Sequence, residues 1–145
     1  MSIFDTSLVK PWADPEIVQM HRRPMRSIHT TYTDFDTART GDRTTSPWFV
    51  SLNGQWKIKR YEDVNEVPAS AISDDTKSWT SISVPGNWTL AGLGDEPHYT
   101  NVQMPWPLRP PETPSENTTG VYRRTFTVPK NWKSRRTIIH IGAAE

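Results

Sequence analysis

With 145 residues, the chain has room for about one domain. A hydrophobic content of 34% and a mean hydropathy of −0.70 indicate a thin aliphatic core, and seven tryptophans add large aromatic side chains to it. A net charge of +1 gives no reason to expect a nucleic-acid partner, and the absence of cysteine excludes disulfides and thiolate metal sites. No stretch approaches the ~20 apolar residues of a membrane span and no signal peptide is evident, so we expect no membrane partner and a cytoplasmic location.

Residues 1–46 are predicted to form an extended, irregular N-terminal arm. Proline residues interrupt it as far as Pro24, and the segment 34–46 is polar and rich in turn-forming residues. A short helix is predicted to begin near Asp14 as its N-cap, with Pro15 at the first helical position. Because so short a helix is marginal in isolation, the arm is expected to lie against another surface.

Four segments after the arm are predicted to be strands: residues 49–61, 79–84, 121–128 and 136–141. The first three alternate between apolar and polar residues, which is typical of half-buried strands, whereas the fourth is more continuously apolar and is predicted to be central. Asn53-Gly54 is predicted to mark a bend or bulge in the first strand. The polar stretch 61–77 is predicted to be a surface loop.

Antiparallel strands with long connections predict an all-β fold of the β-sandwich type. The chain ends at Glu145 with no closing turn and no partner for the second edge of the last predicted strand. We therefore expect residues 47–145 to be the first part of a truncated domain that is incomplete at its C-terminus. Trp56, Trp79 and Trp132 are predicted to belong to its core.

The segment 84–122 is poor in helix and strand patterns but rich in proline, aromatic and amide side chains. Its prolines restrict the backbone, and they are Pro85, Pro97, Pro105, Pro107, Pro110, Pro111 and Pro114. Disordered linkers avoid aromatic residues, whereas this segment contains Trp88, Tyr99 and Trp106. We therefore predict a stiff, ordered loop that presents side chains.

The residue types of the chain offer no catalytic machinery of their own. The four histidines are scattered without a second ligand at metal spacing, so we assign no metal site. Contiguous carboxylate pairs such as Asp74-Asp75 cannot face each other across a sugar at the ~5–9 Å that a glycosidase requires. Asn101 beside Tyr99, with Trp88 and Trp106 nearby, combines amide and aromatic groups that suit a sugar, although Asn101 could equally cap a turn.

Several motifs follow one another in a specific order along the chain. They are L-N-G-Q-W (52–56), V-P-G-N-W (84–88), P-H-Y-T-N-V (97–102), P-P (110–111) and E-N-T-T-G-V-Y-R-R (116–124). This order, together with W-A-D-P-E-I-V (12–18) in the arm, resembles the N-terminal portion of a β-galactosidase of glycoside hydrolase family 2. The Y-T-N-V and E-N-x-T-G segments resemble the β-galactosidases in particular.

The resemblance implies a jelly-roll β-sandwich, a galactose-binding-domain-like fold, followed in the parent enzyme by further domains and a barrel with two catalytic glutamates. It implies that Asn101, supported by Tyr99 and Val102, binds the galactosyl group, while the parent hydrolyses terminal β-D-galactosides with retention. Neither glutamate lies in this chain, so it contains no catalytic residue and should be inactive alone. No cofactor is expected in this chain, but sodium and magnesium are expected for the full-length parent.

The partners implied by the resemblance are a lactose-like β-galactoside, the remaining domains of the parent and further copies of it in a homo-oligomer, with the arm acting in assembly. Thr118 stands where the family usually has proline, and His98 and Trp106 replace more aliphatic residues, which bears on the shape of the loop. Two other interpretations are a free-standing, non-catalytic carbohydrate-binding module and a fragment of another family 2 enzyme, a glucuronidase or mannosidase.

Overall fold

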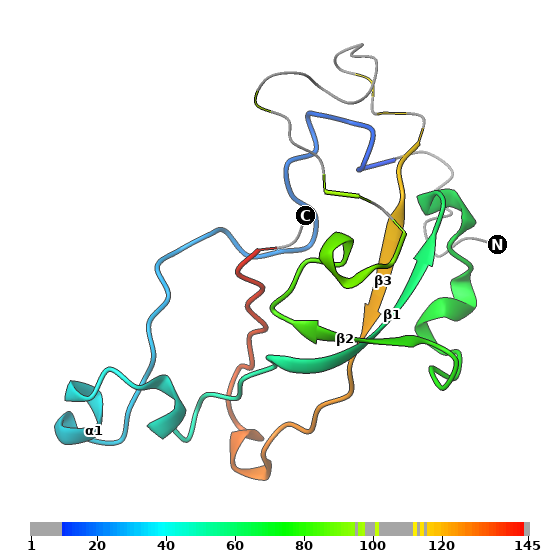
Figure 1. Cartoon of the computed structure of the whole chain (residues 1–145). Helices are drawn as coiled ribbons and strands as arrows, with labels where there is room; N and C mark the ends of the chain where they lie inside the picture. Colours follow the sequence, from blue (N-terminus) through cyan, green and yellow to red (C-terminus); the bar gives the residue numbers. More distant parts are fainter. Residues whose placement is uncertain are drawn as a thin grey trace. The chain divides into compact units, whose positions relative to one another are not determined.

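The computed structural model describes residues 10–94, 96–97, 101, 112, 114 and 116–143 (Figure 1). The chain divides into two compact units, one formed by Met1–Met25 and Asn53–Arg124 and the other by Arg26–Leu52 and Thr125–Glu145. In the described part, strands and turns dominate and the α-helical content is one short helix. This composition agrees with an all-β sugar-binding domain.

The first unit is built on a three-stranded antiparallel sheet. Its strands are β1 (Gly54–Tyr61), β2 (Thr80–Val84) and β3 (Thr119–Arg123), in the order β2-β1-β3. The central strand β1 is paired on both sides, and its Ile58 lies opposite Thr80 on one side and Tyr122 on the other (Figure 1). Since β2 and β3 both run antiparallel to β1, they run parallel to each other.

The core of this unit draws on the sheet and on the connection between β1 and β2. Ile58 and Ile82 are buried in the sheet, whereas Val64, Val67 and Ala71 are buried in the connection. This connection contains the 3₁₀ turns η2 (Val64–Glu66) and η3 (Ala69–Ile72). The prediction of a surface loop over residues 61–77 is therefore wrong in part, because apolar residues spaced along a polar stretch supply half of the core.

Two of the predicted strands are confirmed with narrower limits. The first begins at Gly54 rather than at residue 49, and the φ of +121° at this glycine agrees with the bend predicted at Asn53-Gly54. The second, β2, loses only Trp79, which lies just before it and is buried, as predicted for a core tryptophan. Trp56 and Trp132 are half-buried.

The third predicted strand, residues 121–128, is displaced. The observed β3 begins two residues earlier and ends at Arg123, and the later apolar residues Phe126 and Val128 are 41% and 44% exposed. Arg123 lies opposite Lys57, and the following Arg124 turns its guanidinium to the carbonyl of Asn53. The alternation of the sequence continues past Arg123, but the pairing of β3 with β1 ends at Arg123 and Lys57, and a strand requires a paired neighbour.

The central strand predicted over residues 136–141 is wrong, because the structure has irregular backbone there. Ile138, Ile139 and Ile141 are 46%, 59% and 67% exposed. A strand is held by hydrogen bonds to a neighbouring strand. Within the described residues no segment pairs with this one, so its apolar pattern is not converted into a strand.

The helix predicted to begin at Asp14 is also wrong. The Asp14 carboxylate accepts a hydrogen bond from the backbone N–H of Glu16 at 2.9 Å, and its carbonyl accepts one from Ile17 at 3.1 Å. These bonds close isolated turns. A short polar side chain that binds the backbone two residues ahead competes with helix formation.

A short helix occurs instead in the second unit, in a segment predicted to be turn-rich. This helix, α1, spans Phe35–Arg39 and is capped by Asp34, whose carboxylate accepts hydrogen bonds from the backbone N–H and the hydroxyl of Thr37, both at 2.8 Å. The 3₁₀ turn η1 (Arg43–Thr45) follows it. The helix-capping role that was predicted for Asp14 is thus found at Asp34, in front of a different segment.

The second unit is held together around residues 46–48. The buried hydroxyl of Ser46 donates to the carbonyl of Thr31 at 2.6 Å. Trp132, at the end of η5 (Lys130–Trp132), donates its indole N–H to the carbonyl of Pro47 at 2.8 Å. The guanidinium of Arg135 lies 3.5 Å from the centre of the Trp48 ring, a cation–π contact. Segments far apart in sequence are thus joined here.

Replacing Ile58 by Ala should lower the free energy of unfolding of the chain by about 2–5 kcal/mol, because the change leaves a cavity in the core beside the central strand β1. The matched control is Ile72→Ala, since Ile72 is 70% exposed and its loss should cost less than about 0.5 kcal/mol. Urea unfolding followed by tryptophan fluorescence measures both. Equal losses in the two variants would show that the core is elsewhere.

The pKa of Asp34 should be lowered, first by the backbone N–H of Thr37 and then by the hydroxyls of Thr37 and Thr33. A lowered folded-state pKa means that the capping interaction is present above the unfolded-state pKa and is lost as the pH falls through the folded one. In an NMR titration, Thr37→Val should raise the pKa of Asp34 part of the way to its ordinary value. The control is Thr40→Val, because the Thr40 hydroxyl donates to the carbonyl of Thr37 at 2.7 Å and not to Asp34, so this change should leave the pKa of Asp34 unchanged. An equal shift of that pKa in both variants would contradict the capping role.

Candidate functional site

Of the three predicted sugar-binding residues, Asn101 is the one that the structure describes. Asn101 lies in a turn and is exposed, which suits a side chain that contacts a ligand. Tyr99 and Val102 lie outside the described residues, as do His98 and Trp106 from the same loop. The structure therefore shows that Asn101 is accessible, and the expected support from Tyr99 and Val102 remains a prediction.

The loop that carries Asn101 starts with a well-defined turn. After β2 the Asn87 side chain accepts hydrogen bonds from the backbone N–H of Thr89 at 3.1 Å and from its hydroxyl at 2.8 Å. These bonds begin the 3₁₀ turn η4 (Thr89–Ala91), which ends at Gly92 in the left-handed conformation, φ +71°. Asn87 thus organises the backbone at the start of the loop.

Trp88, which was predicted to lie near Asn101 in the sugar-binding loop, packs against β3. A Cβ atom on Gly120 would lie 3.0 Å from Cζ3 and 3.1 Å from Cε3 of the Trp88 ring, and 3.3 Å from Cε2 of Tyr122. The Trp88 ring therefore lies directly on the backbone of Gly120. This role had no signal in the sequence beyond the glycine itself.

A second contact lies beside the first. Gly94 lies beside the side chain of Arg60, where a Cβ atom would be 3.4 Å from Nε, at ordinary van der Waals distance. Arg60 lies opposite Gly120 in the β1–β3 ladder and forms a bidentate ion pair with Glu62 at 2.6 and 3.0 Å. Partial burial raises the pKa of the nearby Tyr122 hydroxyl above its usual range. The loop therefore crosses a cluster of fixed polar and aromatic groups.

The two arginines of the G-V-Y-R-R motif hold backbone carbonyls. Arg124 donates to the carbonyl of Asn53 at 2.8 Å, which links this motif to L-N-G-Q-W. Arg123 donates to the carbonyls of Ala71, at 3.5 Å, and Asp74, and its guanidinium lies 5.5 Å from the centre of the Trp79 ring. Two of the motifs that carry the resemblance are thus joined by structural contacts.

The described part of the chain offers little that could hold a cation. No three histidine, aspartate or glutamate side chains gather into a group among these residues. Asp74 accepts from the Ser70 hydroxyl at 2.9 Å and Asp75 pairs with Lys77 at 3.0 Å, so both carboxylates serve local turns. The expectation of sodium and magnesium for the longer parent stays a prediction.

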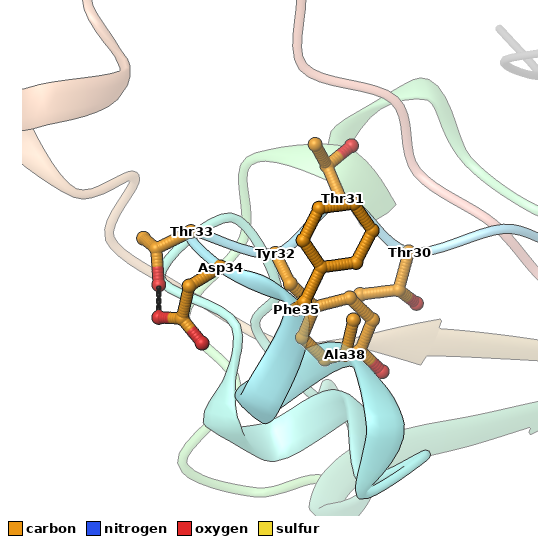
Figure 2. A pocket seen from close by; sticks show the side chains of 7 residues that line it. All are labelled: Thr30, Thr31, Tyr32, Thr33, Asp34, Phe35 and Ala38. Carbon is orange, nitrogen blue, oxygen red and sulfur yellow. Dashed lines mark hydrogen bonds between the residues drawn. The ribbon is translucent and has the colours of Figure 1, made fainter.

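An open hollow of about 420 Å³ lies in the second unit around α1 (Figure 2). It is lined by threonines, Tyr32 and the ring of Phe35, which is 89% exposed. Its one carboxylate, on Asp34, is occupied by Thr33 at 2.9 Å and by the cap of α1. The hollow thus presents an apolar surface with hydroxyl groups and no reactive pair.

The described residues also include no helix long and apolar enough to cross a membrane.

Comparison with known proteins agrees with the resemblance seen in the motifs. The chain is 35% identical over 140 residues to the beta-galactosidase of Psychromonas ingrahamii, a match that covers 92% of this chain and 13% of that protein. It is 37% identical over 131 residues to the beta-galactosidase of Vibrio cholerae, with 87% and 12% covered. The chain therefore spans about an eighth of the length of these relatives.

The model of the sugar binding domain of glycosyl hydrolases family 2 matches residues 49–145. These are 97 of the 145 residues, about two thirds of the chain. The matched region includes the whole three-stranded sheet and the loop with Asn101. The chain therefore belongs to glycosyl hydrolase family 2.

Proposed function

We propose that this chain is the sugar-binding part of a β-galactosidase that hydrolyses terminal β-D-galactosides with retention. The main support for this proposal is the match of residues 49–145 to the family's sugar binding domain. In addition, relatives that are 35% and 37% identical to the chain are beta-galactosidases. In this proposal two glutamates of a barrel domain form and hydrolyse a covalent galactosyl intermediate. This chain binds the sugar and orients it toward them.

Asn101 is the residue to which we assign the sugar contact, with Tyr99 and Val102 as its support. A carboxamide offers a donor and an acceptor to a pair of sugar hydroxyls. Asn101 lies in a turn and is exposed to solvent, so a ligand can reach it. Orienting the galactosyl group contributes to catalysis because it converts a loosely bound substrate into one poised for attack.

The rest of the chain supports that role. We propose that the sheet β2-β1-β3 belongs to a jelly-roll sandwich and that residues 1–46 form the arm that packs against other domains and subunits of a cytoplasmic homo-oligomer. The exposed ring of Phe35 and the exposed Val18, which is 77% accessible, are the apolar groups that such packing would cover. The sodium and magnesium of the parent are proposed to bind other domains.

Asn101→Ala in the full-length enzyme should lower kcat/KM for a galactoside by about ten- to a thousandfold, because a site built to hydrogen-bond a hydroxyl loses heavily when the partner is removed. The melting temperature should be nearly unchanged, since the side chain is exposed. The matched control is Asn131→Ala, an exposed asparagine in η5, which should alter neither quantity. Both are measured on the same preparations.

The opposite pattern would decide against this assignment. Normal kinetics with a lowered melting temperature in Asn101→Ala would mean that Asn101 caps a turn, the alternative that the sequence left open. A drop in kcat/KM of equal size in Asn131→Ala would mean that the measurement reports general damage to the domain.

The 145-residue chain alone should not hydrolyse a chromogenic galactoside, because in this proposal both catalytic glutamates lie outside it. The full-length enzyme, purified in parallel, serves as the positive control. Turnover by the pure chain, free of full-length protein, would contradict the assignment of roles. Turnover of a glucuronide or mannoside instead of a galactoside by the full-length enzyme would favour another family 2 activity.

A further inference from the structure

We propose that Trp88 and Gly120 form a clasp that positions the segment 88–94, and through it Asn101. The clasp is defined as the Trp88 ring lying on the backbone of Gly120. Trp88 is thereby a positioning residue, and Gly120 is the position on β3 that lets it approach. The inference rests on the role proposed for Asn101.

The topology of the sheet creates the need for such a clasp. β2 ends at Val84 opposite Gly54, whereas β3 begins at Thr119 opposite Tyr61, so the two ends of the loop lie at opposite ends of β1. Seven residues of a strand span about 23 Å. The connection must therefore bring the chain from one end of β1 to the other before β3 can start. A connection of this length has many possible paths unless it is held at points in between.

Two contacts hold it over the same place in the sheet. Trp88 rests on Gly120, and Gly94 lies against the side chain of Arg60. Arg60 and Gly120 are opposite each other in the β1–β3 ladder, so both contacts are made over one cross-strand pair. The segment 88–94 is thus fixed on the sheet just before the part of the loop that contains Asn101.

The fit at Gly120 is tight enough that an added methyl group would displace its neighbours by a few tenths of an ångström. A methyl group there would stand 3.0 Å from the Trp88 ring and 3.3 Å from the Tyr122 ring, closer than carbon atoms pack without displacement. The backbone conformation of Gly120 does not require glycine, because Gly120 is not one of the glycines with a positive φ, which are Gly41, Gly54, Gly92 and Gly94. The glycine is therefore needed for the approach of Trp88 and not for the conformation of the strand.

Gly120→Ala in the full-length enzyme should push the Trp88 ring off the strand by a few tenths of an ångström and lower kcat/KM by roughly three- to thirtyfold, since misplacing a binding group by about 1 Å costs about a hundredfold. The matched control is Gly142→Ala, where a methyl group would meet its nearest neighbour, His140, at an ordinary 3.8 Å. It should leave kcat/KM unchanged.

A second variant separates positioning from general destabilisation. Trp88→Phe removes the Cζ3 and Cε3 atoms that the new methyl group would strike, so Gly120→Ala combined with Trp88→Phe should recover activity relative to Gly120→Ala alone. In an Asn101→Ala background, Gly120→Ala should cost little further kcat/KM, because the clasp acts through Asn101. A merely structural role would show neither rescue nor this loss of effect.

The outcomes distinguish this inference from the proposed function. If Asn101→Ala impairs kcat/KM but Gly120→Ala does not, the clasp is wrong and the role of Asn101 stands. If Gly120→Ala impairs kcat/KM equally in the presence and absence of Asn101, the contact does not act through that residue and the inference is overturned. If Asn101→Ala is fully active, both the role of Asn101 and this inference fall.

Discussion

The pairing of β1 with a strand on each side is the constraint from which the rest of the first unit follows. β1 hydrogen-bonds to β2 and β3 at once, and Ile58 at its middle is 1% exposed. Because β2 and β3 are both antiparallel to the strand between them, neither can be reached by a tight hairpin from the other. The chain must therefore make a long connection from β2 to β3, and the connection from β1 to β2 adds buried residues to the core.

The two connections have different functions. The connection from β1 to β2 is short of apolar residues, yet it buries Val67 and Ala71 completely and so completes the core. The connection from β2 to β3 is anchored by Trp88 and Gly94 and carries Asn101 at an exposed turn. A rigid sheet with a pinned loop is the usual way in which a domain presents a ligand-binding side chain.

Motifs that identify the family need not contact the sugar. Arg124 connects the end of β3 to the carbonyl of Asn53, just before Gly54 with its positive φ, and Arg123 donates to the carbonyls of Ala71 and Asp74. The planar guanidinium can serve several acceptors at once, which a lysine could not do in the same geometry. These residues therefore maintain the sheet on which the loop rests, while the sugar contact is proposed for a single amide.

The sequence by itself determined the strands whose alternation lies next to turn-forming residues, namely β1 after Asn53-Gly54 and β2 before Pro85, and the burial of Trp79. Through the order of its motifs it also indicated the family, while Asn101 as the sugar-binding residue stays a prediction. Only the tertiary structure decided the limits of β3, the irregular backbone of residues 136–141, the burial of the polar-looking connection and the contact of Trp88 with Gly120. Alternation shows which face of a segment is apolar, but hydrogen-bond partners and the atoms that meet a glycine come from residues distant in the chain. Pairing and close packing are therefore properties of two segments together, and no single stretch of sequence contains them.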